Sequence, residues 1–220
     1  MGVSFNGSTQ FLRRSTQFTA PFSVSLWFYP TDQVNQQTIF IVQSAIATSE
    51  AHAIFLIGAT GLLVAQDTTG GTLAAGASVS GVNFDAWNHL CCVFDSTAGI
   101  NLNLNGGSVD NGIYQAASTN RCRIAAQQNT SIPVTHGSFF TGNIAEVGVW
   151  NVDIDAIWPD MRAALAHGWS PLCFNKPGAM DLIHYAQFLG RLKDATGGTG
   201  WTADGAPPYV ANPPKMIYPA

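Results

Sequence analysis

The chain of 220 residues is 46% hydrophobic and 10% charged, and its formal net charge is −4 at pH 7. Its length allows one sizeable core, and because the charged fraction is well below the ~25% of an average soluble domain, uncharged polar residues must cover much of the surface. The nine basic residues are scattered, with close pairs at Arg13–Arg14 and at Arg121 and Arg123, and no apolar run approaches the ~18 residues of a membrane helix. We therefore predict neither a nucleic-acid partner nor a membrane partner.

Short alternating runs separated by turn residues predict β-strands throughout the first 150 residues. In residues 22–29, every second side chain from Phe22 is apolar, the others are expected on the opposite face, and Pro30 ends the pairing. Further strands are predicted at residues 38–46, 51–57, 62–66, 87–94 and 139–150.

Two of these runs carry more detailed expectations. Residues 100–104 alternate and lead into Asn105-Gly106, which predicts a hairpin with a type I′ turn because both central residues tolerate a positive φ. In residues 139–150, simple alternation predicts Ile144 and Glu146 on one face and Val147 and Val149 on the other.

The C-terminal part departs from the strand pattern. One short helix is predicted at about residues 158–167, with Pro159 in its first turn and Gly168 at its end. Residues 1–205 are expected to form one domain that includes this helix, and residues 206–220, with five prolines, an extended arm. Its large apolar side chains are unusual for a disordered tail, and those predicted to bind a partner are Tyr209, Met216, Ile217 and Tyr218.

The four cysteines do not form an obvious disulfide framework or metal knuckle. Cys91 and Cys92 are adjacent and would point to opposite faces of a strand, and Cys122 and Cys173 lie far from them in the sequence. We predict buried free thiols, which fit assembly in a reducing cytoplasm. The N-terminus shows no basic and apolar segments of a secretory signal, so export is not expected unless a signal has been removed.

Five segments between residues 5 and 151 form an ordered set of motifs. They are Phe5-Asn-Gly-Ser, Phe22-Ser-Val-Ser-Leu-Trp-Phe, Trp87-Asn-His-Leu, Asn101-Leu-Asn-Leu-Asn-Gly and Phe140-Thr-Gly-Asn-Ile-Ala-Glu-Val-Gly-Val-Trp-Asn. This set resembles the strand motifs of the laminin-G-like, concanavalin A-like family. The resemblance implies an all-β, antiparallel jelly-roll β-sandwich, here with one short C-terminal helix and an extended Pro-rich tail.

The residues after Trp150 are similar to those of laminin-G-like proteins encoded by tailed bacteriophages. They include Trp169-Ser-Pro, Leu182-Ile-His-Tyr-Ala, Leu192-Lys-Asp, Trp201-Thr-Ala-Asp-Gly and the final Ile-Tyr-Pro. In those proteins such domains serve as virion structural, decoration or fibre components. This part of the resemblance therefore implies a structural role in a virion.

The sequence offers no paired catalytic groups, so we predict no enzyme and no catalytic residue. Catalytic relatives on this fold, which resemble family 16 glucanases, need two Glu flanking an Asp on one strand, whereas Glu146 stands alone and is expected to hydrogen-bond neighbouring backbone. No histidine has a Cys or Ser partner at an informative spacing, although sequence distance leaves a spatial triad open. The histidines are His52, His89, His136, His167 and His184.

We predict no cofactor and no metal, with calcium as the alternative, because laminin-G-like relatives bind it through rim loops. The loop candidates are Asp67, Asp85, Asp95 and Asp110, but none stands in a D-x-D arrangement. Asp153 and Asp155 do, and this pair is expected to cap a helical turn instead.

Sugar binding would require an exposed aromatic ring beside polar side chains. Trp27, Trp87 and Trp150 lie in strand motifs and are predicted to be core residues. The remaining tryptophans, Trp158, Trp169 and Trp201, are expected to pack the helix and tail. No sugar-binding residue is assigned from the sequence.

Two functions follow from these observations. The first is a non-enzymatic virion protein, either a capsid decoration or a tail or fibre component. It would form a homo-oligomer or bind other virion proteins, assemble in the host cytoplasm and also contact host-surface glycans. The alternative is a carbohydrate-binding module at a bacterial cell surface or in the extracellular medium. The low charge fits either an ordinary sandwich surface or one buried against other subunits.

Overall fold

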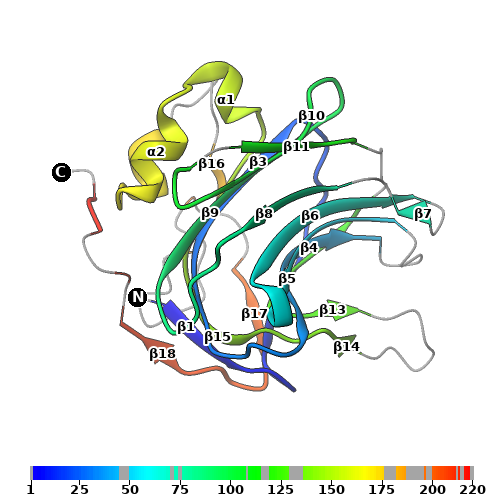
Figure 1. Ribbon diagram of the computed structural model, residues 1–220, viewed down its shortest axis with the longest axis vertical. Helices are drawn as coiled ribbons and strands as arrows, with labels where there is room; N and C mark the ends of the chain where they lie inside the picture. The colour runs from blue at the N-terminus through cyan, green and yellow to red at the C-terminus, as the bar shows by residue number, and fades with distance from the viewer. Residues whose placement is uncertain are drawn as a thin grey trace.

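The computed structural model describes residues 2–44, 50–69, 72–73, 76–107, 109–114, 119–128, 136–175, 182–186, 196, 200–211, 213 and 216–218. Two eight-stranded antiparallel sheets, here called A and B, pack face to face around one main core (Figure 1). This arrangement confirms the predicted all-β jelly-roll sandwich. None of the helices in the described part of the chain is long and apolar enough to cross a membrane.

Sheet A contains both the first and the last strand of the described chain. Its strand order is β11-β10-β9-β3-β15-β1-β18, and β16 also pairs with β15. The strands are β1 (Gly2–Asn6), β3 (Phe22–Pro30), β9 (Asn88–Asp95), β10 (Gly99–Leu104), β11 (Val109–Gly112), β15 (Thr141–Trp150), β16 (Leu182–Ala186) and β18 (Tyr209–Val210).

Sheet B faces sheet A across the core. Its strand order is β17-β2-β12-β4-β5-β6-β7, and β8 also pairs with β6. The strands are β2 (Phe11–Ser15), β4 (Gln36–Gln43), β5 (Ala51–Ile57), β6 (Leu62–Thr69), β7 (Thr72–Leu73), β8 (Ala77–Ser80), β12 (Arg121–Ile124) and β17 (Thr202–Asp204). A separate hairpin joins β13 (Gln127–Gln128) and β14 (His136–Gly137).

The period-2 pattern of the sequence places the core as predicted. In β3, the alternating apolar residues from Phe22 to Phe28 lie in the main cluster between the sheets. The predicted hairpin is also confirmed, because Asn105 and Gly106 have φ values of 54° and 71°, and the Gly107 amide donates to the Leu104 carbonyl at 3.0 Å.

The predicted alternation in residues 139–150 is wrong after Ile144. Val147 and Val149 lie in the core together with Ile144, because a β-bulge shifts the register of β15 against β3. Glu146 lies in the bulge with a φ of 53°. The extra residue reverses the faces expected from simple alternation.

The single helix predicted at residues 158–167 is replaced by two shorter helices, α1 (Ile154–Ile157) and α2 (Met161–Ala166). The predicted cap at Asp153 is confirmed, because its carboxylate accepts hydrogen bonds from the first backbone amides of α1. Asp155 instead forms an ion pair with Arg162 of α2 at 2.8 Å. Short 3₁₀ turns occur at η1 (Gly58–Thr60) and η2 (Pro171–Phe174).

Sheet A carries a second apolar layer on the face directed away from sheet B. Figure 1 shows α1 and α2 beside β9 and β16, outside the sandwich. The buried residues of this layer are Cys91, Val93, Trp150, Ile154, Met161, Leu165, Phe174, Leu182 and Tyr185. The helices therefore cover an apolar sheet face that would otherwise contact water.

The Pro-rich segment predicted as an extended arm lies along its own sandwich where the structure describes it. Strand β18 pairs with β1, and the Ser4 amide donates to the Pro208 carbonyl at 2.9 Å. Further along, Ile217 forms a parallel bridge with Trp169, and its carbonyl accepts from the Ser170 amide at 2.8 Å.

Candidate functional site

An arginine-lined pocket lies where β2, β12 and β17 meet in sheet B. Its volume is about 200 Å³. The residues that line it are Arg13, Arg14, Ser15, Arg121, Arg123 and Thr202. The chain has a negative net charge and only nine basic residues, yet four of them are among the residues that line this one hollow.

Strand register brings these side chains together. Arg13 of β2 is paired with Arg123 of β12, and Thr202 of β17 is paired with Arg13. Leu12 and Ile124 are buried in the main core, so their neighbours Arg13 and Arg123 point to the outer face of sheet B. The pocket is therefore built on regular strands.

The edge strand β17 forms one boundary of the pocket. Trp201, immediately before β17, is 5% exposed and belongs to the main core, which anchors this strand to the sandwich. The pairing of β17 with β2 ends at Arg13, so Arg14 and Ser15 lie beyond its end. On the opposite side, Arg123 is paired with the buried Ile41 of β4.

The pocket concentrates positive charge on side chains with different degrees of exposure. The Arg13 side chain is 54% exposed, and its Nε donates to Asp204 Oδ2 at 2.8 Å. Arg123 is only 2% exposed; burial, followed by the nearby Arg121, lowers its pKa to about 10. Arg123 therefore remains charged at neutral pH. Because grouped guanidinium charges repel one another, the arrangement favours a bound anion.

The sequence showed the two arginine pairs but not that they meet. Arg13–Arg14 and Arg121/Arg123 are far apart along the chain, and their basic residues were predicted to be scattered. The signal that could have found them is the shared alternation of β2 and β12, in which an apolar core residue neighbours an outward arginine. The pairing register of β2 with β12, which a local sequence pattern does not encode, places the two arginine pairs beside each other.

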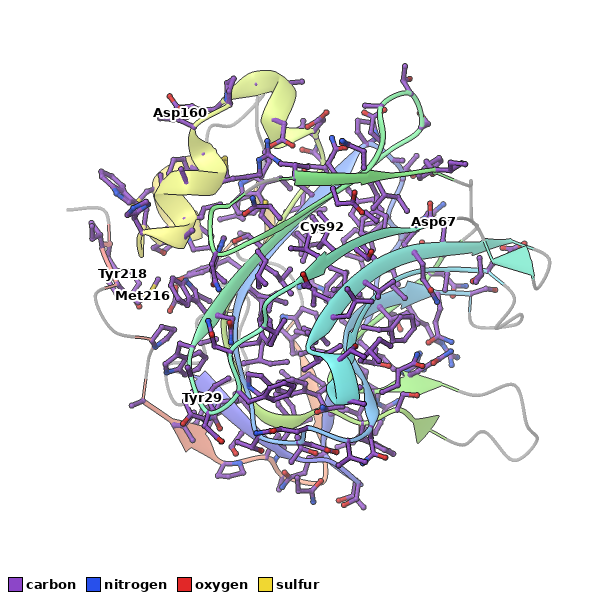
Figure 2. All side chains as sticks on the ribbon, in the orientation of Figure 1. Tyr29, Asp67, Cys92, Asp160, Met216 and Tyr218 are labelled. Carbon is purple, nitrogen blue, oxygen red and sulfur yellow. The ribbon has the colours of Figure 1, made fainter. Side chains whose placement is uncertain are left out.

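The four residues predicted to bind a partner occupy two places on the C-terminal segment. Tyr209 lies on β18 and is 40% exposed, whereas Met216 is half-buried. Figure 2 shows Met216 and Tyr218 beside α2. Ile217 and Tyr218 are 44% and 37% exposed. Their assignment to a partner remains a prediction.

Glu146 is held by tyrosine hydroxyls, whereas backbone partners were expected. Its Oε1 accepts from Tyr218 at 2.9 Å, its Oε2 accepts a short hydrogen bond from Tyr185, and Ser170 Oγ lies 3.0 Å from the Tyr185 hydroxyl. Burial raises the pKa of Glu146, and the tyrosine hydrogen bonds oppose that rise. Glu146 therefore joins the C-terminal segment to the bulge of β15.

The buried histidines form two separate pairs. His52 Nδ1 lies 2.7 Å from Asp67 Oδ1, and the His52 ring lies 5.3 Å from that of the core residue Phe94, centre to centre, in a tilted arrangement. His89 Nε2 lies 2.8 Å from Ser25 Oγ. Residues Ser25 and His89 point away from sheet B, on the same face as Trp27. Sheet A therefore separates the His52–Asp67 pair from the Ser25–His89 pair. They do not form one catalytic triad.

The cysteines are free, as predicted, but they are not all buried. Cys92 lies in the main core and Cys91 in the outer layer of sheet A, which confirms their opposite orientation. Cys122 is also buried, and burial raises the pKa of all three thiols. Cys173 is half-buried and donates to the Ile217 carbonyl at 3.6 Å. The prediction of burial is wrong for this residue, which lies beneath the C-terminal segment.

The aspartates proposed as loop ligands are dispersed. Asp67 was expected in a loop, but it is completely buried in β6. Asp95 accepts hydrogen bonds from the amides of the turn that follows β9, and Asp110 accepts from the Ser78 amide at 2.6 Å. Within the part of the chain that the structure describes, no three His, Cys, Asp or Glu residues group to hold a metal.

The tryptophans differ from the simple core assignment. Trp150 is fully buried, but Trp27 and Trp87 are half-buried: Trp27 faces outward from β3, and Trp87 directly precedes β9. Trp158 and Trp169 are 48% and 43% exposed. Both rings contact Phe174, with ring centres 5.3 and 6.3 Å away.

The chain belongs to the concanavalin A-like lectin/glucanases superfamily, whose family model matches residues 5–156. This match confirms the family resemblance drawn from the ordered strand motifs. No curated protein matches the chain.

Solved structures show the same fold at low sequence identity. A native heptameric SAP-like pentraxin from Limulus polyphemus is 14% identical, with a TM-score of 0.60, and the match covers 92% of this chain and 94% of the pentraxin. A candidate carbohydrate-binding protein from Bacteroides ovatus is 16% identical, with a TM-score of 0.62, covering 94% and 62%. The IT-sialidase CBM40 of Ruminococcus gnavus, bound to α2,3-sialyllactose, is 12% identical, with a TM-score of 0.56, covering 75% and 96%.

Proposed function

We propose that this protein is a non-catalytic glycan-binding module that takes its ligand at the arginine pocket of sheet B. The observation that carries this proposal is the polar hollow of about 200 Å³ on regular strands, where the guanidinium groups of Arg13, Arg121 and Arg123 share the outer face with the hydroxyls of Ser15 and Thr202. Backbone-supported side chains give a binding site its precision. The sialyllactose bound to the CBM40 module of the same fold supports a saccharide as the ligand class.

The absence of catalysis is part of the proposal. Paired carboxylates would be required for glycoside hydrolysis. Glu146 is completely buried between Tyr185 and Tyr218, and the acidic group at the pocket, Asp204, is held by Arg13. Incubation with bound glycans should therefore leave them intact when they are analysed by chromatography.

A glycan array tests the binding function. The full chain should bind at least one glycan, and filling the pocket with Thr202→Trp should remove that binding. Thr202 is exposed on an edge strand, so the larger side chain can enter the hollow without displacing the core. Thr97→Trp, at an exposed turn of sheet A, is the matched control. Glycan binding that survives Thr202→Trp would contradict the site, and no binding to any glycan would contradict the function.

A role in virion structure or adhesion is the second proposed function, supported by exposed apolar side chains on the helical side of the molecule. Ile157, Trp158, Trp169, Ile217 and Tyr218 are 37–48% exposed. A capsid decoration or tail component would bury such a surface against another copy or another virion protein. The alternative setting for glycan binding is a bacterial surface or the extracellular medium. The mass and symmetry of the native particle, measured by cryo-electron microscopy, distinguish a virion assembly from a single module.

A further inference from the structure

We infer that the arginine pocket recognises the acidic group of a saccharide, a carboxylate or sulfate carried by one sugar ring. The inference rests on the proposed glycan-binding function and names the class of its ligand. It is drawn from the charge, burial and shape of the pocket.

The charge around the pocket is strongly one-sided. Its lining contains four arginines, and the other two lining residues, Ser15 and Thr202, are neutral. Asp204, adjacent to the lining, pairs with the Nε of Arg13. Since the whole chain has a net charge of −4, this local excess of positive charge opposes the overall composition.

The guanidinium groups combine fixed and adjustable contacts. Arg123 is 2% exposed and therefore has little freedom to reorient, and Asp204 orients the more exposed Arg13. Arg121 is half-buried at the same hollow, whereas Arg14 is paired with the core residue Cys122 and points to the inner face of sheet B. A guanidinium presents parallel N–H donors that match the two oxygens of a carboxylate or sulfate. The hydroxyls of Ser15 and Thr202 suit the hydroxyls of the attached ring.

The shape of the pocket favours a single acidic group over a charged polymer backbone. Its volume of about 200 Å³ is smaller than the ~300–1,000 Å³ of sites that enclose drug-sized ligands. The arginines also surround one hollow between neighbouring strands and do not form a line along the surface. The pocket is therefore matched to one ring with its anion, and the rest of a glycan would extend into solvent beyond β17.

Matched probes separate charge from sugar. The full chain is titrated by calorimetry with lactose, 3′-sulfated lactose, trigalacturonate and the methyl ester of trigalacturonate. Acidic probes should bind at least about tenfold more tightly than their neutral counterparts, because a charge-assisted hydrogen bond changes affinity by roughly that factor. The sulfated and carboxylated probes show which anion is preferred. Their affinity should fall as NaCl rises from about 0.05 to about 0.5 M.

Two substitutions locate the effect. Arg121→Gln and Arg13→Gln should each weaken the acidic probes about tenfold or more. Arg162→Gln removes the same charge on α2, outside the pocket, and should leave all affinities unchanged. Circular dichroism and melting temperature verify that each variant is folded, and Arg121→Lys, which keeps the charge but not the planar fork, should recover only part of the affinity.

The outcomes distinguish the two proposals. Equal affinity for acidic and neutral probes at the pocket would overturn acidic-group recognition and leave glycan binding intact. Binding of inorganic sulfate at the pocket without binding of any glycan would overturn both, because the inference requires a saccharide. Loss of acidic-probe affinity in Arg162→Gln equal to that in Arg121→Gln would also overturn the inference, since the effect would then reflect net charge.

Discussion

The outer faces of the two sheets differ in chemistry although both sheets share one core. On sheet A, the outward residues Cys91, Val93 and Trp150 are fully buried beneath short helices. On sheet B, the outward residues Arg13 and Arg123 surround a polar hollow. An apolar sheet face must be covered to be stable, whereas a charged face gains nothing for folding by gathering like charges. The outside of sheet A therefore carries an extended covered apolar layer, whereas the outside of sheet B combines the charged hollow with a smaller buried cluster of Ile41, Ala51, Ala53 and Phe55.

The largest expected effect is on the covered face. Trp150→Ala should lower the free energy of unfolding by about 3–5 kcal/mol. Trp150 is 0% exposed, and its indole nitrogen donates to the Phe174 carbonyl at 3.3 Å. Urea unfolding measures the change. Trp169→Ala removes an exposed ring of the same layer and should cost about 1 kcal/mol or less. Equal costs would mean that the layer does not pack as a core.

Acid should weaken the same face through His89. Burial lowers the pKa of His89 from its ordinary value of 6.5 to about 3, so the native state excludes a proton that the unfolded state binds. This contribution is complete above pH 6.5 and is lost as the pH falls towards 3, by about 1.4 kcal/mol per pH unit. His89→Gln, which can still hydrogen-bond Ser25, should flatten that part of the melting-temperature profile. Parallel profiles for both proteins would exclude His89 as the cause.

A smaller effect is expected where the C-terminal segment meets Glu146. Tyr218→Phe removes the hydroxyl 2.9 Å from Glu146 Oε1 and should cost about 1 kcal/mol at neutral pH. Because the pKa of Glu146 is raised from 4.5 by burial, its protonated form favours the native state; that stabilisation is present below pH 4.5 and is lost as the pH rises through the folded pKa.

The cost of Tyr218→Phe should therefore shrink in acid, where the carboxyl no longer needs the hydroxyl. Thermal melts at several pH values measure this dependence. Tyr209→Phe, at the exposed tyrosine of β18, should change stability by less than about 0.5 kcal/mol at any of these pH values. A cost for Tyr218→Phe that did not vary with pH would show that the carboxylate is not its energetic partner.

The smallest effect on stability is expected on the charged face. Arg121→Gln should change the free energy of unfolding by no more than about 0.5 kcal/mol, and towards higher stability at low salt, because it removes one of three neighbouring positive charges on the outer face of sheet B. Denaturant unfolding at two salt concentrations tests this sign. A loss of several kcal/mol would show that the arginines are structural, and the contrast between the two faces would then disappear.

Much of the fold could be predicted from the sequence because core side chains alternate. The faces of β3, the turn at Asn105-Gly106 and the opposite orientation of Cys91 and Cys92 follow from a period of two and from residues that tolerate a positive φ. The bulge at Glu146 could not be predicted, because the residues of this segment do not mark the position at which one extra residue interrupts the alternation. The break between α1 and α2 was similarly missed.

The candidate site was the least predictable part. Arg13–Arg14 and Arg121/Arg123 read as two unrelated pairs until β2 and β12 are placed side by side. Exposed and buried positions of tryptophan were also missed, since a strand motif does not state whether its outer face is covered. Pairing between distant strands determines where the arginines meet, and coverage by other segments determines which tryptophans are buried. A local sequence pattern predicts neither of these.

Strand β18 has a consequence for how densely this protein can be packed with its copies. Without it, β1 would be the edge strand of sheet A, with an open row of backbone donors and acceptors. β18 pairs with Gly2 and Val3, is two residues long and directly follows Pro207 and Pro208, which have no backbone N–H to offer a further strand. The proline-rich end of the chain thus terminates the sheet. It hinders neighbouring copies of this protein from pairing edge to edge at this side of the sheet.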